Sequence, residues 1–166
     1  MKILCTICAR GNSKGVANKA LKRIKNVPLI GITIRQALKS SLFDQVVIST
    51  DSKKIQTIGK KYGGKSWFLR PTFLSNDYSS KILAIRHALL ASEKYFNTKF
   101  DICVDLDITS PLRNIGDIKK SLKIFLKNKA KNLFSVCESK KNPYFNMVEI
   151  RNKKVMLIKR NKKNKY

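Results

Sequence analysis

Acidic residues are scarce in this 166-residue chain, which holds 10 Asp and Glu against 36 Lys and Arg and has a formal net charge of +26. Such a charge first indicates a protein that binds nucleic acid or another acidic surface. However, 28 of the cations are Lys and only 8 are Arg, whereas recognition of base edges favours the rigid fork of arginine. The lysines are also scattered along the chain. We therefore interpret the charge as a compositional bias and expect no specific nucleic-acid partner, although a basic nucleic-acid-binding protein stays open as an alternative function.

Long apolar runs are also missing, since no stretch approaches the roughly 18 residues that a membrane span requires. Met1 and Lys2 lead directly into an apolar segment, without the separate apolar region of a signal peptide. We expect a cytoplasmic protein with no membrane partner. The single histidine, His87, falls within a helical pattern, so a zinc site would need all four cysteines as ligands. We expect the cysteines to be reduced core residues instead; they are Cys5, Cys8, Cys103 and Cys137.

The spacing of apolar residues predicts strands that alternate with amphipathic helices. This pattern is typical of the α/β class, here a doubly wound and mostly parallel sheet with helices on both faces, as in Rossmann-like folds. Strands are expected at residues 3–8, 45–50, 65–69, 101–106 and 133–137; helices are expected over about 28–40, after Asp51-Ser52, after Ser79 or Ser80, and from Asp117.

The end of the chain departs from this alternation. Met147 to Ile150 and Val155 to Ile158 are predicted to form a hairpin across Asn152-Lys153, and a basic tail follows. We therefore divide the chain into an α/β domain, residues 1–146, and a hairpin with its tail, residues 147–166.

The loop after the first strand has the composition of a phosphate-binding site. Between Arg10 and Lys19 it contains two glycines, one serine, two asparagines and three cations. Backbone N–H groups of such a loop can point at an anion that the cations surround. Neither the dinucleotide-binding glycine pattern nor the Walker pattern is present, so we predict a polyphosphate cradle of another kind.

Three further polar clusters follow predicted strands: Ser49 to Asp51, Arg70, and Asp105 to Arg113. Ligands of doubly wound sheets bind at the carboxyl ends of the strands. One cluster alone is more simply a helix cap or a turn, whereas four at the same sheet edge indicate a binding site.

Five short motifs occur in order along these segments. They are Ala9-Arg10-Gly11-Asn12-Ser13-Lys14-Gly15 with Lys19, then Ser49-Thr50-Asp51, Leu69-Arg70-Pro71, Leu74-Ser75-x-Asp77 with Ser79-Ser80, and Thr109-Ser110-Pro111-Leu112-Arg113. Together they resemble the signatures of acylneuraminate cytidylyltransferases, the nucleotidyltransferases that make CMP-sugars from CTP. The segment from Asp105 to Thr109 further resembles members that act on legionaminic or pseudaminic acid.

The resemblance implies a reaction in which the anomeric hydroxyl of a sialic acid-like nonulosonic acid attacks the α-phosphorus of CTP and pyrophosphate leaves. It also implies Mg²⁺ or Mn²⁺ as cofactor, with CTP and the sugar acid as partners. Such a transfer depends mainly on neutralising the triphosphate charge and aligning the reactants. By the motif match, Arg10 and Lys19 would be the catalytic residues; the nucleotide would be bound by Ala9, Gly11, Asn12, Ser13, Lys14, Gly15, Arg70, Ser80, Thr109 and Ser110.

Two positions depart from the family pattern. Many members have a nucleotide-contacting Asn where this chain has Ala20, and Gln-Pro where it has Asp107-Ile108. An aspartate is an oxygen ligand for Mg²⁺, so we assign Asp107, together with Asp105, to the metal.

Family members also continue beyond the point where this chain stops, which implies a C-terminally shortened chain and a homodimer in the full-length form. Two other functions stay open from the sequence: a catalytically impaired fragment that only binds nucleotide, and a sugar nucleotidyltransferase for 3-deoxy-octulosonate or another acceptor.

Overall fold

The computed structural model describes residues 1–13 and 15–159 of the chain. The chain divides between Lys129 and Ala130 into two units. The division falls earlier in the chain than the domain boundary predicted at residue 146.

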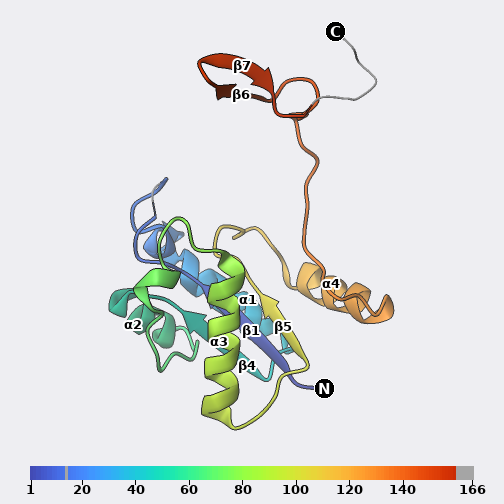
Figure 1. Ribbon diagram of the computed structural model, residues 1–166. Coiled ribbons are helices and arrows are strands. Elements are labelled where there is room, and N and C mark those ends of the chain that lie inside the picture. Colours follow the sequence, from blue (N-terminus) through green and yellow to red (C-terminus); the bar gives the residue numbers. More distant parts are fainter. Residues whose placement is uncertain (14, 160–166) are drawn as a thin grey trace. The chain divides into compact units, whose positions relative to one another are not determined.

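A three-stranded parallel sheet forms the centre of the first unit (Figure 1). Its strands are β1 (Ile3–Cys8), β4 (Gln45–Ser49) and β5 (Ile102–Asp105), in the order β4-β1-β5. The chain therefore moves from β1 to one side of the sheet and later crosses to the other side. This reversal creates a switch point next to β1, where the loops after β1 and β5 diverge and where doubly wound proteins bind their ligands.

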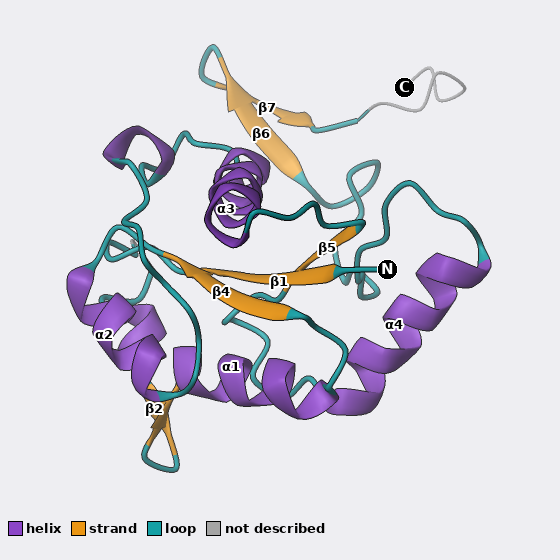
Figure 2. Ribbon diagram, turned by 90° about the horizontal axis from the view of Figure 1, so that it is seen from below, coloured by secondary structure: helices purple, strands orange, loops and turns teal. Residues whose placement is uncertain are grey.

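Helices cover both faces of this sheet (Figure 2). Helix α3 packs against β1 and β4 from one face, while α1 packs on the opposite face and contacts α2 and α4. The predicted doubly wound α/β fold is thus confirmed. The bounds are Leu29–Ser40 for α1, Lys53–Lys61 for α2, Lys81–Phe96 for α3 and Ile115–Lys127 for α4.

The local sequence explains where these elements begin. The first five residues of β1 are buried, as expected of a strand covered on both faces. Side-chain oxygens cap three helices, because Ser52 accepts the amide of Ile55 and Ser80 accepts that of Ile82, while Asn114 opens a capping box with Asp117. Sequence reasoning had placed the start of α4 at Asp117, two residues too late.

Four short elements complete this unit. They are the 3₁₀ helices η1 (Lys19–Leu21) and η2 (Thr72–Leu74) and the strands β2 (Arg23–Ile24) and β3 (Val27–Pro28). Strands β2 and β3 form a hairpin that the sequence did not predict. Its turn residues Lys25 and Asn26 both have positive φ, as a type I′ turn requires.

Two predicted strands are not formed. Of the strand expected at 65–69, only a single parallel bridge between Val47 and Lys65 remains. Side chains hold the rest of that segment instead, since Gln56 donates to the carbonyl of Phe68 and Ser66 donates to that of Ile48. The strand expected at 133–137 is irregular and exposed, and no strand of the described part of the chain pairs with it.

The second unit contains the predicted hairpin, with β6 (Val148–Arg151) paired antiparallel to β7 (Lys154–Leu157). Asn152 and Lys153 form its turn with positive φ, which confirms the prediction. The basic tail lies outside the described residues from position 160 onward.

Within residues 1–13 and 15–159, no helix is long and apolar enough to cross a membrane. The four cysteines are free thiols. Cys5, Cys8 and Cys103 lie in the sheet as expected, whereas Cys137 is exposed in the irregular segment where a strand was predicted.

Candidate active site

The loops that follow β1 and β4 are tied together at the carboxyl edge of the sheet. Asp51 comes two residues after β4, and its Oδ1 atom accepts the backbone N–H of Gly11 at 2.7 Å. Ala9 is buried and donates its N–H to the carbonyl of Ser49, so it extends the sheet. Asp51 therefore fixes the start of the predicted phosphate cradle, and the amides of Ala9 and Gly11 are both engaged in holding it.

Arg10 extends from this cradle to the segment that precedes α3. Its Nη1 atom lies 2.7 Å from Oδ1 of Asp77, and about a third of each side chain is exposed. An anion that enters the cradle thus meets a guanidinium that already has a carboxylate partner. Lys19 begins η1 and is half-buried, whereas the neighbouring Ala20 is fully buried in the hydrophobic core.

The remaining cradle residues are less constrained. Asn12 and Gly15 are exposed and Ser13 is half-buried, and a Cβ on Gly15 would meet no atom within 4 Å. Lys14, predicted to bind nucleotide, lies outside the described residues.

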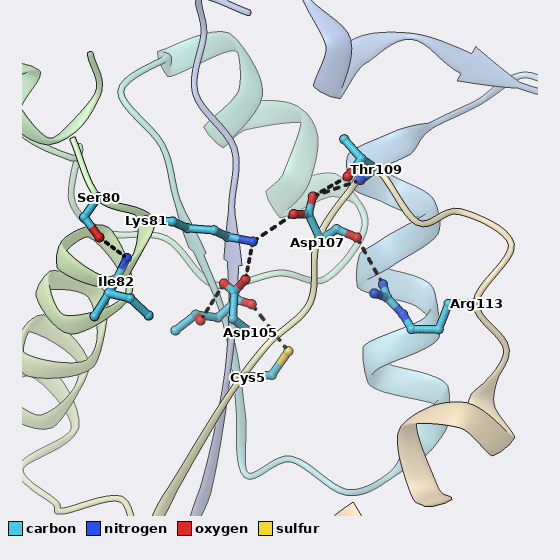
Figure 3. Close-up of polar contacts among 9 residues, drawn as sticks. Cys5, Ser80, Lys81, Ile82, Asp105, Asp107, Thr109 and Arg113 are labelled. Carbon is cyan, nitrogen blue, oxygen red and sulfur yellow. Dashed lines mark hydrogen bonds and ion pairs between the residues drawn. The ribbon is translucent and has the colours of Figure 1, made fainter. Parts of the chain in front are cut away.

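Two carboxylates converge at the end of β5 (Figure 3). Asp105 is the last residue of β5, and Asp107 follows two residues later. The ammonium of Lys81 lies between them, with Nζ 2.6 Å from Oδ2 of Asp105 and 2.9 Å from Oδ2 of Asp107. The structure thus brings together the two residues predicted to bind metal, and it places a lysine ammonium where their oxygens meet.

Hydrogen bonds from the chain orient both carboxylates. Thr6 donates its hydroxyl to Oδ1 of Asp105 at 3.0 Å. Thr109 donates its backbone N–H and its hydroxyl to Oδ1 of Asp107 at 3.0 and 2.8 Å. Partial burial opposes ionisation of Asp107, but the hydrogen bonds from Lys81 and Thr109 outweigh it and lower the pKa of this carboxyl to about 2. Asp107 is therefore charged at neutral pH.

The loop after Asp107 is held against α1. Arg113 donates to the carbonyl of Asp107 at 3.3 Å and to the side-chain oxygen of Gln36 at 3.2 Å. Gln36 in turn donates to the carbonyls of Pro111 and Arg113. Ser110 is exposed, and its carbonyl accepts the backbone N–H of Arg113. Thr109 is also exposed, but its hydroxyl is bonded to Asp107.

Arg70 and Ser80 lie on either side of the segment that carries Asp77. Arg70 is buried, bonds Thr50 through its backbone and donates from Nε to Ser75 at 3.0 Å. Ser80 caps α3 through its Oγ atom, which accepts the N–H of Ile82. Both residues were predicted to hold cytidine, and this stays a prediction; in the structure Nε of Arg70 and Oγ of Ser80 help to hold the loop of residues 70–80 in place.

Sequence reasoning assigned no role to Lys81 or to Thr6. Nothing in the sequence distinguishes Lys81 from the other lysines except its place directly after the capping Ser80, at the start of a helix. Asp77 and Asp51 were noted within motifs, but their contacts with Arg10 and Gly11 depend on the folded loops.

The donor set is suited to a divalent cation shared with phosphate. One oxygen of Asp105 and one of Asp107 face a single cationic group, and Mg²⁺ in nucleotide enzymes is commonly held by one or two carboxylates together with substrate phosphates. The described residues contain no group of three or more Asp, Glu, His or Cys side chains that could hold a metal without such help.

The sequence of the chain matches a family of known proteins. A family model described as Cytidylyltransferase matches residues 4–166. The chain is 47% identical over 158 residues to a CMP-N,N'-diacetyllegionaminic acid synthase of Campylobacter jejuni, and 46% identical over 158 residues to a post-translational flagellin modification protein B of Campylobacter coli. Each alignment covers 95% of this chain and 67% of the relative.

A solved structure of CMP:2-keto-3-deoxy-manno-octonic acid synthetase complexed with CTP is similar in fold, with a TM-score of 0.61 and 23% sequence identity. The match covers 78% of this chain and 49% of that chain, so the present chain spans about half of that structure. At this identity the likeness supports the fold alone. From the family match and the two relatives, the chain belongs to the cytidylyltransferase family.

Proposed function

We propose that this protein transfers CMP from CTP to the anomeric hydroxyl of a nonulosonic acid of the legionaminic type and releases pyrophosphate. The observation that carries the proposal is the convergence of Asp105 and Asp107 beside the cradle that contains Arg10. The 47% identity to a CMP-N,N'-diacetyllegionaminic acid synthase supports the choice of sugar acid. An octulosonate acceptor has less support, because the similar solved structure of a CMP:2-keto-3-deoxy-manno-octonic acid synthetase is only 23% identical.

The protein's contribution to the reaction is mainly electrostatic. Arg10 and Lys19 supply fixed positive charge where the triphosphate would lie, and the Asp51–Gly11 hydrogen bond keeps the backbone of that loop in place. Charge held in position before the reaction stabilises the charge that develops on the leaving pyrophosphate. When CTP binds, Arg10 can exchange its contact with Asp77 for one with phosphate.

Asp105 and Asp107 would hold a divalent cation, Mg²⁺ or Mn²⁺, through the two Oδ2 atoms that face Lys81. A divalent ion bound there would neutralise phosphate charge and polarise the bond to the leaving group. Thr6 and Thr109 act on the carboxylates, because their hydrogen bonds keep the remaining oxygens turned away from that position.

The test combines binding and turnover. Thermal unfolding would be followed with CTP, ATP, GTP or UTP, each with Mg²⁺, and with free pyrophosphate as the reference, because a ligand of the folded state raises the melting temperature. CTP should stabilise the protein more than the other nucleotides and more than pyrophosphate. Pyrophosphate release would then be measured with N,N'-diacetyllegionaminic, pseudaminic, N-acetylneuraminic and 3-deoxy-octulosonic acids.

Legionaminic acid should give the fastest release, and Asp107→Asn should abolish it. A matched control is Asp101→Asn, since Asp101 bonds the backbone of Lys2 at the opposite end of β1. Equal stabilisation by all nucleotides and by pyrophosphate, without release from any sugar acid, would contradict the proposal.

We further propose a homodimer and a cytoplasmic location. The dimer is supported by large apolar side chains that the second unit exposes, including Phe134, Val136 and Phe145, each at least 76% accessible, because such surface usually marks an interface. Light scattering after size exclusion should give twice the chain mass, and a monomer at micromolar concentration would refute the dimer.

The cytoplasmic location is supported by the proposed substrate, since CTP is found in the cell interior.

A further inference from the structure

Lys81 is the first residue of α3, and its ammonium is the only cationic group of the described chain in contact with both Asp105 and Asp107 (Figure 3). Its side chain is 45% exposed, so it reaches the carboxylates from the solvent side of the site. Asp105, by contrast, is 13% exposed. A half-exposed ammonium therefore pairs with a less exposed carboxylate.

The four oxygens of the two carboxylates are divided in a regular way. One oxygen of Asp105 accepts the hydroxyl of Thr6, and one oxygen of Asp107 accepts two donors of Thr109. The other oxygen of each carboxylate lies against the ammonium of Lys81, at 2.6 Å for Asp105 and 2.9 Å for Asp107. Two oxygens thus converge on one point, and a cation of this chain occupies it.

The distances show that this point holds one cation at a time. Nζ lies 2.6 and 2.9 Å from the two oxygens, whereas Mg²⁺ binds carboxylate oxygens at about 2.0–2.1 Å. A divalent ion bound to both oxygens would take the place of the ammonium. The pair of carboxylates carries two negative charges and the ammonium only one positive charge, so exchange for a divalent ion would complete the neutralisation.

The segment that carries Lys81 also reaches the phosphate cradle. Asp77, four residues before Lys81, pairs with Arg10 at 2.7 Å. Residues 77–81 therefore extend from the cradle to the carboxylate pair. A lysine side chain is long and flexible, so an ammonium released from Asp105 and Asp107 can turn towards a triphosphate held beside Arg10.

We propose that Lys81 is an internal counter-ion that occupies the cation position between Asp105 and Asp107, leaves it when a divalent cation binds, and then contacts the triphosphate of the nucleotide. This role rests on the proposed function, because it assigns the residue to the same site. Lys81 would keep the two Oδ2 atoms close together before the metal binds. Once displaced by the metal, its ammonium would add one positive charge at the phosphates.

The proposal predicts effects of opposite sign on two ligands. Lys81→Met removes the competing ammonium, so Mn²⁺ alone should bind roughly threefold to fivefold more tightly, as expected for loss of a partly exposed ion pair. The same variant lacks the charge that would contact phosphate, so CTP should bind several-fold more weakly in saturating Mn²⁺. A merely structural role for Lys81 would weaken both ligands together.

Mn²⁺ binding would be measured without nucleotide, from the electron paramagnetic resonance signal of the free ion. Lys94→Met is the matched control, because Lys94 is an exposed lysine in the last turn of the same helix, and it should leave the Mn²⁺ affinity unchanged. Lys81→Arg keeps the charge and should stay within about twofold of the native protein. Asp107→Asn in the Lys81→Met background should remove the gain.

Mn²⁺ affinity that is equal in Lys81→Met and in the native protein, including no detectable binding in either, would overturn the proposal. So would tighter binding of both Mn²⁺ and CTP by the variant. Failure of the proposed function would look different, because the native protein would then show no preference for CTP while the nucleotide-free Mn²⁺ titration would still decide the role of Lys81.

Discussion

Removal of the Asp51 carboxylate should loosen the phosphate cradle by a measurable amount. Oδ1 of Asp51 accepts the N–H of Gly11 at 2.7 Å, and a hydrogen bond to a charged group contributes about 1.5–3 kcal/mol to stability. Both residues are half-buried, so water can partly replace the lost partner and the lower end of that range applies. For Asp51→Ala we expect a loss of about 1.5 kcal/mol, or about 3–6 °C in melting temperature.

A second aspartate provides a control that matches this bond in length and chemistry. Oδ2 of Asp44 accepts the N–H of Ile3 at 2.6 Å, at the opposite end of β1. Asp44→Ala should therefore cost about as much stability as Asp51→Ala, by the same hydrogen-bond magnitude. Only Asp51→Ala should speed hydrogen exchange at the amides of residues 10–13, because only that variant releases the loop.

The functional consequence is isolated by comparing two substitutions that remove the same charge. Asp51→Asn keeps a side-chain oxygen that can accept the N–H of Gly11, whereas Asp51→Ala keeps none. The Asn variant should bind pyrophosphate about threefold to tenfold more tightly than the Ala variant, since a neutral hydrogen bond is worth about 0.5–1.5 kcal/mol. Isothermal titration measures both. Equal affinities, or equal exchange rates in the Asp44 and Asp51 variants, would refute the view that this bond orders the cradle.

Three further predictions concern pH, thiol reactivity and packing. The pKa of Asp107 is lowered to about 2, so its contribution to stability is complete above its ordinary pKa near 4 and is lost as the pH falls towards 2. Because the side chain is nearly half exposed, this contribution should be about 1 kcal/mol or less. In urea unfolding, the native protein should lose more stability between pH 5 and pH 2.5 than Asp107→Asn does, and an equal loss in both would contradict the prediction. Burial raises the pKa of Cys5 well above that of a free thiol, so iodoacetamide at pH 8 should modify the exposed Cys137 before Cys5. Equal rates of modification at the two cysteines, measured by mass spectrometry, would contradict the burial of Cys5. A Cβ on Gly59 would collide with the buried side chain of Ile48, so Gly59→Ala should lower the free energy of unfolding in chemical denaturation by about 1–2 kcal/mol. The double variant Gly59→Ala/Ile48→Val should recover part of this loss. If the losses of the two single variants simply add in the double variant, the contact is contradicted.

The sheet and its helices could be predicted because their determinants are local. The first strand runs over Ile3–Cys8 as expected from its apolar run, and the helix predicted over about 28–40 is Leu29–Ser40. The failed strands depend on context. The segment at 133–137 has the composition of a strand but finds no partner among the described residues, and β-propensity expresses itself only where a neighbouring edge and a packed face exist.

The candidate site could be predicted to the level of loops, but not to the level of contacts. Asp105 and Asp107 could be placed at one edge of the sheet because parallel strands bring their carboxyl ends together. The contact with Lys81 depends on how α3 packs against β1 and on which way a long side chain extends, and neither is encoded in sequence spacing. Motif matching assigned Ser80 to the nucleotide, but it did not indicate that the Oγ atom of Ser80 also caps α3.

The scarcity of acidic residues gives the retained carboxylates particular weight. Each of the seven aspartates accepts a backbone amide or pairs with a cation in the structure. Three hold backbone amides near β1, three pair with cations at the carboxyl edge of the sheet, and one completes a helix cap: Asp44, Asp51 and Asp101, then Asp77, Asp105 and Asp107, then Asp117. A chain whose composition is biased towards lysine can lose exposed carboxylates with little loss of stability, because exposed ion pairs contribute at most about 1 kcal/mol to the free energy of unfolding. Loss of a carboxylate that holds a buried amide or a cation at the site costs more. In such a chain the positions of the aspartates are therefore a better guide to the site than the net charge.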